Sequence, residues 1–456
     1  MPVRNDIPTV VISNFAEAHV DFLGRCANPR EREELISSEA YHADRTLLWA
    51  GDPKLVIVSY EIAHADLICK RLNFQSTIHA YPQIPTHFLS RDILRETQLL
   101  NKIVKYAGEK RLVQLIPYAT TPEFLELVDV LRNEHQLDVR TPESPEKKDF
   151  WLRDYVDTKA GYRILASTWL ADADDLLPFG VACYNLDQAL RVAESFSSRN
   201  ISCVLKADTG ESGIGTFIIH PHKGELDQEI KQGLLTDPYF RSELIVVEEF
   251  ISAREQLSPS LEISVPKLGE GIPEITYISK QLFLKFGDFC GIQVDKSLYE
   301  AAWYPRLESS GLILANQLQA LGYVGHFDID CIVRDDGHLY MLEINARRTG
   351  GTHVHDFAKH FYGDDYIDKA SFISYEAMNS GAITDPGVLV EVLQDYLLPI
   401  KGDERFGLII TITRALHNHR FGCIAVAHTA QEAIQLQQDV LAHIQKTCQS
   451  NAIASD

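Results

Sequence analysis

The sequence predicts a multidomain protein that combines an α/β unit with an α+β unit. Its 456 residues exceed the size at which a single hydrophobic core usually stops growing. Short apolar runs alternate with helical patterns up to about residue 148, whereas strand runs at antiparallel spacing dominate after it. The charged segment TPESPEKKDF (141–150), which carries two prolines, is typical of a linker between the two units.

The first unit, residues 1–148, has the alternation of a doubly wound α/β domain. The expected strands are 9–13, 54–59 and 112–118, and the expected helices are 17–23, 63–72 and 121–135. No GxGxxG motif follows the first strand, so the fingerprint of a dinucleotide-binding domain is absent.

The middle of the chain, residues 149–370, predicts an α+β domain, and residues 371–456 predict a small C-terminal α/β unit. The middle domain is expected to contain helices 187–200 and 308–322, strands 201–207, 216–220, 243–251, 261–265 and 274–279, and a strand pair over 325–342. The C-terminal unit is expected to contain strands 407–416 and 423–429, joined by a turn, and a closing helix over 430–447.

The composition limits the classes of partner. The chain has 43 Lys and Arg against 64 Asp and Glu, a net charge of −21, which argues against non-specific binding of nucleic acid or anionic membranes. It contains no apolar run of about 18 residues and opens with no secretory leader pattern. The eight cysteines are scattered without a CxxC pair, which favours reduced, buried thiols and a cytoplasmic protein.

A glycine loop is the first candidate for chemistry. Lys206 ends a strand, and the following ADTGESGIGTF places Gly210, Ser212, Gly213 and Gly215 before the next strand. Backbone N–H groups of such a loop can approach phosphate oxygens because no Cβ intervenes, and the lysine adds a point charge. A simple turn is the competing interpretation, with about equal weight.

A strand ending in acidic residues is the second candidate. Glu248 and Glu249 close an apolar run, with Ile251 and Glu255 after them. Exposed backbone at such a strand end can pair with the edge of a purine, while a nearby acid accepts hydrogen bonds from ribose hydroxyls. Taken alone, a solvated strand end is the simpler interpretation.

The third candidate is EINARRTGG (343–351), which follows the expected strand pair. Asp330 and Glu343 lie on the two strands of a hairpin, so their carboxylates can converge on one side. Strand alternation turns Asn345 and Arg347 to the same face. Two carboxylates and an amide oxygen suit Mg²⁺, and the arginine can bind phosphate or an oxyanion. A buried ion-pair network is the alternative.

Together these three motifs resemble the ATP-grasp superfamily of carboxylate–amine ligases, over roughly residues 150–360 and in the same order. The resemblance implies a Rossmann-like pre-ATP-grasp domain followed by an ATP-grasp fold, with a lid subdomain at about 167–250. It adds Lys159, in DTKAGYR, as the first nucleotide lysine. It further implies ATP and Mg²⁺ as cofactors, with Mn²⁺ as a substitute, and suggests a homodimer.

Finer features resemble the peptide ligases of the pheganomycin type: LSPSLEISVP, NARRTGGTH and the C-terminal HNHRFGCIAVAHT. That group joins a carboxylic acid to an amine of an amino acid or peptide through an acyl phosphate, releasing ADP and phosphate. The implied catalytic residues are Arg347 and, with it, Arg348. Such sequences often carry a second threonine and a proline around the histidine, whereas this one reads Thr352-His353-Val354-His355, so the roles of His353 and His355 stay open. A kinase that phosphorylates a small-molecule hydroxyl on the same scaffold is the alternative function.

Overall fold

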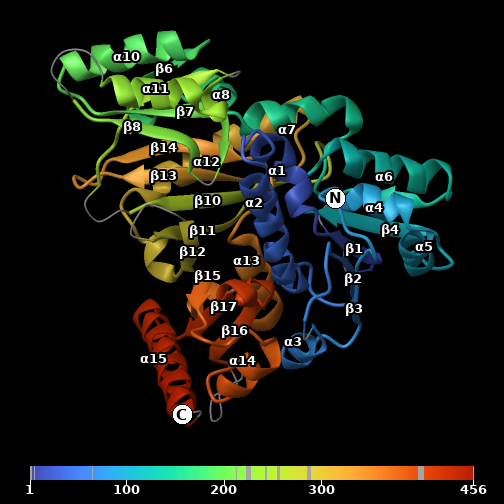
Figure 1. Ribbon diagram of the computed structural model, residues 1–456. Helices are drawn as coiled ribbons and strands as arrows, with labels where there is room; N and C mark the ends of the chain where they lie inside the picture. The colour runs from blue at the N-terminus through green and yellow to red at the C-terminus, as the bar shows by residue number, and fades with distance from the viewer. Residues whose placement is uncertain are drawn as a thin grey trace.

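The computed structural model describes residues 3–4, 6–63, 65–211, 213–221, 227–241, 244–253, 257–284, 289–398 and 405–454. Within them the strands form three sheets: a five-stranded, a four-stranded and an eight-stranded one. Figure 1 shows the four-stranded sheet and its helices at one end of the eight-stranded sheet, called the large sheet below. The five-stranded sheet lies beside the large sheet. The sequence predicted three units along the chain, and the described strands form three sheets, whose division differs from that of the predicted units.

The N-terminal domain is built on the parallel sheet β3-β2-β1-β4-β5. Its strands are β1 (Thr9–Ile12), β2 (Lys54–Ile57), β3 (Thr77–Ala80), β4 (Leu112–Pro117) and β5 (Asp138–Arg140). Its helices are α1 (Phe15–Leu23), α2 (Pro29–Tyr41), the 3₁₀ helix η1 (His42–Leu48), α3 (Ala65–Arg71), α4 (Leu89–Arg95), α5 (Thr97–Tyr106) and α6 (Pro122–Asn133). All predicted strands and helices of this unit are present, and the doubly wound architecture is confirmed.

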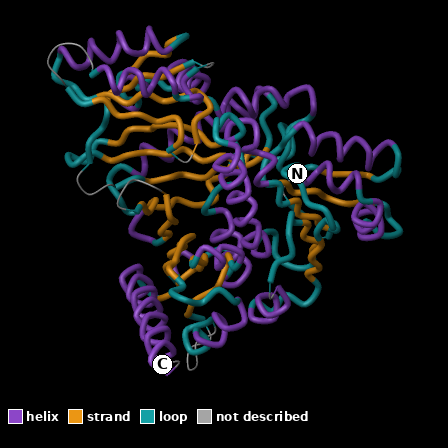
Figure 2. Tube along the Cα trace, in the orientation of Figure 1, coloured by secondary structure: helices purple, strands orange, loops and turns teal. Residues whose placement is uncertain are grey.

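The segment between β1 and β2 is longer than a single crossover helix requires. After α1 the chain forms α2 and η1 before it returns to the sheet. In Figures 1 and 2 these helices run through the middle of the molecule, alongside the large sheet. Leu47 belongs to the same buried cluster as Tyr277 and Phe372, so the N-terminal domain contributes side chains to the face of a sheet built by residues more than 200 positions later.

Three helices connect the N-terminal domain to the four-stranded sheet: α7 (Phe150–Asp157), α8 (Lys159–Trp169) and α9 (Ala173–Leu176), preceded by η2 (Lys147–Asp149). The antiparallel sheet has the order β6-β9-β7-β8. Its strands are β6 (Gly180–Cys183), β7 (Cys203–Glu211), β8 (Ile214–Ile219) and β9 (Ile245–Glu249), and its helices are α10 (Leu186–Ser198), α11 (Gln228–Thr236) and η3 (Pro238–Phe240). This unit lies within the range proposed for a lid.

The eight-stranded antiparallel sheet has the order β14-β13-β10-β11-β12-β15-β17-β16. Its strands are β10 (Pro259–Val265), β11 (Glu274–Phe283), β12 (Phe289–Val294), β13 (Gly325–Val333), β14 (Leu339–Asn345), β15 (Ser371–Asn379), β16 (Gly407–Ile412) and β17 (Arg420–Ala427). The accompanying helices are η4 (Lys296–Leu298), α12 (Tyr304–Leu321), α13 (Thr352–Tyr362), η5 (Tyr366–Asp368), α14 (Pro386–Val392), η6 (Arg414–Asn418) and α15 (Ala430–Ala454). The strands predicted for the C-terminal unit therefore continue the large sheet rather than form a sheet of their own.

Each face of the large sheet has its own hydrophobic core. On one face, α7, α8 and α12 cover residues such as Phe327 and Met341. On the other, buried residues of α13 and the strands pack against the N-terminal domain, where Trp49 and Phe372 belong to the same cluster. Because this core is shared, the N-terminal domain and the large sheet form one packed unit.

The cysteines are mostly buried, as predicted. All eight cysteines are free, and seven of them are buried. None of the helices in the described part of the chain is long and apolar enough to cross a membrane.

Candidate functional site

The glycine loop forms the tip of an antiparallel hairpin between β7 and β8, as predicted. Gly213 and Gly215 have φ angles of 82° and 76°, a region that other residues rarely adopt. A Cβ on Gly210 would lie 2.9 Å from the carbonyl oxygen of Ile214, so the hairpin also needs glycine for close backbone approach. Ser212 lies outside the described residues.

Two lysines from different elements lie beside this hairpin. Lys159, at the start of α8 and only 8% exposed, contacts the carbonyl oxygen of Gly210 and lies 3.3 Å from a Glu343 carboxylate oxygen. Lys206, on β7, lies 2.8 Å from Glu248. Burial lowers the pKa of Lys206, but Glu248 and Glu343 outweigh burial and raise it. Both ammonium groups therefore lie in one acidic, largely buried region.

The residues of the acidic strand end are divided between two environments. Glu248, on β9, is 4% exposed and pairs with Lys206 and with Arg163, the latter at 2.9 Å. It thus lies on the lysine side of the site. Glu249 is half-buried and pairs with β7, and Ile251 is buried after the strand ends. Glu255 lies outside the described residues.

The carboxylates of the large sheet meet as the hairpin argument predicted. Asp330 on β13 is directly opposite Glu343 on β14, and Asn345 is opposite Asp328. The amide of Asn345 donates to Asp330 at 3.0 Å, and the amide of Gln281, on β11, donates to it at 2.6 Å. Burial and Glu343 raise the pKa of Asp330 to about 6. The pKa of Glu343 is lowered, because Lys159 and Lys206 outweigh the effect of burial.

Sequence reasoning missed two members of this cluster, Asp328 and Gln281. Asp328 is buried and accepts a hydrogen bond from Ser260 at 2.9 Å, while its Oδ1 has no hydrogen-bond partner among the described residues. Burial and the neighbouring Asp330 raise its pKa well above the usual value. The alternation Asp-Ile-Asp at 328–330 carried the signal, because residues two apart on a strand share a face. Gln281 had no signal before the order of the strands was known.

The donor set suits a hard divalent cation. No group of three or more His, Cys, Asp or Glu side chains within the described residues could hold a metal ion by itself. Two facing carboxylates with amide neighbours are instead the partial set that Mg²⁺ takes alongside substrate phosphates. One Asp328 oxygen has no hydrogen-bond partner among the described residues, and the pKa of Asp330 is raised. The negative charge of these acids is therefore not fully balanced by donors and cations of the described residues.

Arg347 lies close to the N-terminal domain. Its guanidinium carbon lies 5.6 Å from the centroid of the Tyr118 ring, and one nitrogen is 3.5 Å from the side-chain oxygen of Asn345. Arg347, Tyr118 and Arg153 line one small cavity between the domains. The arginine thus lies between the carboxylate cluster and a wall contributed by the first 120 residues.

Arg348 is placed differently, which corrects its predicted partnership with Arg347. It is 3% exposed, and its guanidinium donates two hydrogen bonds of 2.7 Å to Glu143 and one of 2.9 Å to Asp356. The same group lies 4.7 Å from the ring of Trp49. Since its donors are already engaged by buried carboxylates, this geometry supports a structural rather than a catalytic role.

Glu143 shows that the predicted linker is not merely a spacer. It lies 3.5 Å from the Nε2 of His326, whose Nδ1 is 3.0 Å from Glu262. Burial lowers the pKa of His326, but the two glutamates outweigh it and raise the pKa to about 9. Glu262 also accepts hydrogen bonds from Thr349 and Thr352 in the loop after Arg347. The network therefore ties that loop to both the linker and the large sheet.

The histidines of the 353–360 segment are not arranged as a metal site. His353 is 1% exposed and lies 3.4 Å from the hydroxyl of Ser374, and burial lowers its pKa well below the usual value. His355 contacts the hydroxyl of Tyr366 at 3.0 Å. The two histidines therefore have separate partners.

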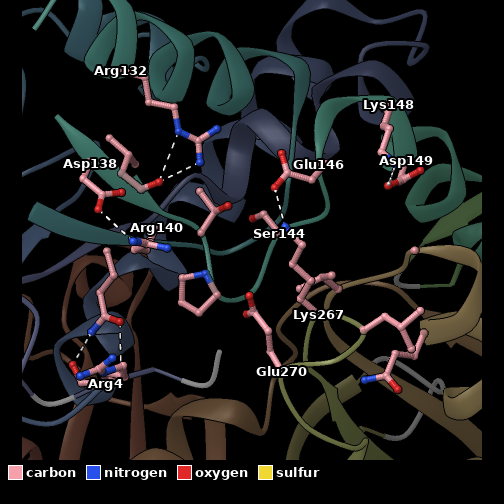
Figure 3. Close-up of a pocket in the computed structure, with 18 of the residues that line it drawn as sticks. Arg4, Arg132, Asp138, Arg140, Ser144, Glu146, Lys148, Asp149, Lys267 and Glu270 are labelled. Carbon is pink, nitrogen blue, oxygen red and sulfur yellow. Dashed lines mark hydrogen bonds and ion pairs between the residues drawn. The ribbon is translucent and has the colours of Figure 1, made fainter. Parts of the chain in front are cut away.

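A larger cavity of about 460 Å³ lies on the other side of the linker, between β5, the loop near Lys267 and the end of α12. Figure 3 shows that its charged side chains pair locally: Lys267 lies 3.1 Å from Glu146, and Arg140 lies 2.9 Å from Asp138. None of the predicted site residues lines it. Its size alone does not make it the functional site.

Comparison with known proteins gives structural neighbours alone. No family model matches the chain, and no curated protein matches its sequence. Biotin carboxylase of Campylobacter jejuni, solved as a β-γ-ATP complex, superposes with a TM-score of 0.59 at 13% identity, covering 96% of this chain and 95% of that one. The biotin carboxylase domain of the Hydrogenobacter thermophilus 2-oxoglutarate carboxylase, with MgADP and bicarbonate, gives 0.55 at 13%, covering 96% and 90%.

An N5-carboxyaminoimidazole synthase of Aspergillus clavatus, in complex with ADP and its aminoimidazole ribonucleotide, gives a TM-score of 0.51 at 10% identity, covering 97% of this chain and 99% of that one. At such identities the likeness establishes the fold. The predicted fold class, an α/β domain followed by an ATP-grasp fold, is confirmed.

Proposed function

We propose that this protein is an ATP-dependent ligase that joins a carboxylic acid to an amine, forming an amide bond through an acyl phosphate. The observation that carries the proposal is the convergence of Lys159 and Lys206 on the Asp330–Glu343 pair beside the glycine hairpin. Cations, hard oxygen donors and a glycine hairpin in one place suit a nucleoside triphosphate with its divalent cation. The structural neighbours with bound adenine nucleotides support the same assignment.

The nucleotide would lie between the four-stranded sheet and the large sheet. Lys159, Lys206 and the hairpin glycines 210, 213 and 215, with Ser212, are proposed to hold its phosphates. Glu248, Glu249, Ile251 and Glu255 are proposed to hold its purine and ribose, with Glu248 closest to the lysines. The four-stranded sheet would act as the lid of an ATP-grasp domain spanning 149–370.

Asp330, Glu343 and Asn345 would hold Mg²⁺, or Mn²⁺ in its place. When bound, such an ion neutralises charge on the phosphates during phosphoryl transfer. Lys159 and Lys206 orient the same phosphates, and burial of the cluster strengthens each of these interactions. The role of the chain is to position groups and exclude water, because an acyl phosphate hydrolyses readily.

In the first step a substrate carboxylate oxygen attacks the γ-phosphorus of ATP, and ADP leaves. In the second, an amine attacks the acyl carbon and phosphate leaves. Arg347, beside Asn345 and Tyr118, is placed to stabilise the tetrahedral oxyanion between these events. Arg348 would keep the loop in place rather than touch the substrate.

The pheganomycin-type peptide ligases remain the proposed subgroup, with an amino acid or peptide supplying the amine. A cytoplasmic location and a homodimer belong to the same proposal. The kinase alternative shares every phosphate-binding residue, but no observation in the structure favours a hydroxyl acceptor over an amine.

The test is product release from purified protein with Mg-ATP and pools of carboxylic acids and amines, alone and paired. We expect ADP and free phosphate in quantity only when an acid and an amine are both present. ADP with an alcohol and no free phosphate would identify a kinase. AMP with pyrophosphate would contradict the acyl-phosphate route.

A further inference from the structure

The glycine hairpin of the four-stranded sheet, which is the proposed lid, also touches the N-terminal domain. Ile214, the first residue of β8, packs against a buried cluster that includes Phe22 of α1. A Cβ placed on Gly215 would lie 3.5 Å from the Cζ of Phe22, whose side chain is 6% exposed. The phenylalanine ring therefore fills the space beside a glycine that is proposed to hold phosphate.

The 3₁₀ helix η3 brings a second residue of the lid to the same place. The centroid of the Tyr239 ring lies 4.7 Å from that of Phe22, with the two planes tilted by 40°. Phe240, the next residue, belongs to the lid's own core, whereas Tyr239 belongs to the cluster with Phe22. Because η3 also packs against β7 and β8, the contact of Tyr239 with Phe22 fixes the two strands that carry the hairpin.

The rest of this cluster comes from the N-terminal domain. Its other buried members lie on α1, on α2 and between them, and are Ala16, Leu23, Cys26, Ile36 and Ala40. These residues form an apolar seat into which the lid inserts Tyr239. Burial of apolar surface and the contact of two aromatic rings both favour the seated arrangement.

The other end of α1 reaches the wall on which Arg347 lies. Phe15, the first residue of the helix, stacks on Tyr118 with the ring centroids 3.8 Å apart, and Arg347 lies over the same Tyr118 ring. Phe15 and Phe22 are separated by about 10 Å along the helix axis. One short helix therefore contacts the phosphate hairpin at one end and the proposed oxyanion site at the other.

The hydroxyl of Tyr239 opposes permanent seating. The side chain is 9% exposed, and its hydroxyl has no hydrogen-bond partner among the described residues. Water satisfies this hydroxyl when the contact opens, so closing the contact carries a cost that a phenylalanine would not have. A fixed core contact gains nothing from such a group, whereas a contact that must open to release products does.

Resting on the proposed ligase function, we propose that Phe22 is a positioning residue that seats the phosphate-binding hairpin when the lid closes, and that Tyr239 keeps this seat reversible. The seated lid excludes water from the acyl phosphate until the amine attacks. Without the seat, water attacks the acyl carbon instead. A C–O bond to water forms, the C–O bond to phosphate breaks with its electron pair leaving on phosphate, and the water protons pass to phosphate and solvent. The acid is regenerated, so ATP is consumed without amide.

The test measures KM for ATP and the number of phosphates released per amide in the full-length enzyme. We expect Phe22→Ala to raise KM for ATP about tenfold, since loss of an aromatic contact is worth about that much. It should also raise the ratio of phosphate to amide above one, which a purely structural role would not do. Phe22→Leu keeps most of the apolar contact and should restore both values toward those of the wild type.

Tyr239→Phe should act in the opposite direction. It removes the buried hydroxyl and so favours the closed lid, to which the nucleotide binds best. We expect KM for ATP to fall severalfold while the ratio of phosphate to amide stays at one. If Phe22→Ala does not fold, this variant decides alone, and a KM for ATP equal to or above that of the wild type overturns the seat.

Phe88→Ala is the matched control. Phe88 is a partly buried phenylalanine of the same domain, and it lies beneath Arg91 as Phe22 lies beneath Arg25. Its variant should keep the wild-type KM and ratio. If the wild type forms amide and folded Phe22→Ala matches it in both values, the seat is overturned and the ligase function stands. If the wild type forms no amide from any acid and amine, the ligase function itself is overturned.

Discussion

At the scale of single residues, Glu343 links the carboxylate cluster to the two lysines. It lies opposite Asp330 in the β13–β14 ladder and 3.3 Å from the ammonium of Lys159. The Glu343 carboxylate therefore lies next to Asp330, a proposed metal ligand, and next to Lys159, a proposed phosphate-binding residue. Asp328 was not predicted, although the Asp-Ile-Asp alternation at 328–330 places it on the same face of β13 as Asp330.

Glu343→Gln removes this charge while preserving the side-chain shape. We expect at least a 100-fold loss of turnover, since a single preorganised electrostatic partner is commonly worth about that much. The melting temperature should stay close to that of the wild type. Glu146→Gln, which breaks an exposed pair with Lys267, is the control and should keep full activity. Activity that survives Glu343→Gln would contradict the metal assignment.

His326 is expected to make the protein less stable as the pH rises into the alkaline range. Its pKa is raised from 6.5 to about 9 in the folded state, because Glu143 and Glu262 outweigh burial. The unfolded chain loses this proton near pH 6.5, so the stabilisation is complete below that pH and disappears as the pH rises through about 9. We expect the free energy of unfolding to fall by about 3 kcal/mol over this window. Denaturation of His326→Gln should lack that slope; a slope equal to that of the wild type would contradict the assignment.

At the scale of elements, the loop between β14 and α13 illustrates what the sequence could and could not predict. The hairpin and the convergence of Asp330 with Glu343 on one side followed from strand alternation and a tight turn. The register did not, because a bulge between Asp330 and Cys331 places Asp330 directly opposite Glu343. The burial of Arg348 in an ion-pair network could not be predicted, because its partner Glu143 lies 205 positions earlier in the chain. The charged segment 141–150 has the composition of an exposed linker, and only tertiary packing shows that one of its glutamates is buried.

Gly351 tests how tightly this loop is fixed against the large sheet. A Cβ there would lie 2.6 Å from the Cδ1 of Ile292 and would also contact the hydroxyl of Tyr277, both in the core. We expect Gly351→Ala to cost about 1–3 kcal/mol of stability, because a well-packed core resists added volume. Gly233, in α11, has nothing within 4 Å of the same position, so Gly233→Ala should be neutral or stabilising. Chemical denaturation of both variants measures the difference, and equal stabilities would contradict the packing argument.

At the scale of the whole molecule, the large sheet joins regions that the sequence separates. The proposed boundary near residue 370 falls between β14 and β15, yet β15 pairs with β12 on one side and β17 on the other. Sequence patterns identify strands but not their neighbours, so the C-terminal strands could be predicted while their place in the sheet could not. The order of the motifs along the chain sufficed for the ATP-grasp fold, because it reflects local patterns rather than long-range pairing.

Truncation after residue 370 tests whether the fold of the large sheet depends on residues 371–456. The shortened chain would expose the edge of β12 and remove Phe372, Ile424 and Val426 from the core shared with the N-terminal domain. We expect it to aggregate or to unfold without a cooperative transition, since an exposed sheet edge and an open core are both unfavourable. A cooperative transition near that of the full chain would instead show that residues 371–456 form an independent domain.

The central claim is that a substrate carboxylate becomes an acyl phosphate. It is tested most directly with a substrate acid labelled with ¹⁸O in its carboxylate, ATP, Mg²⁺ and the amine found in the pooled assay. If the carboxylate attacks the γ-phosphorus, one labelled oxygen leaves with each phosphate, and mass spectrometry of the released phosphate will detect it. Unlabelled phosphate, or label recovered in AMP, would contradict the account.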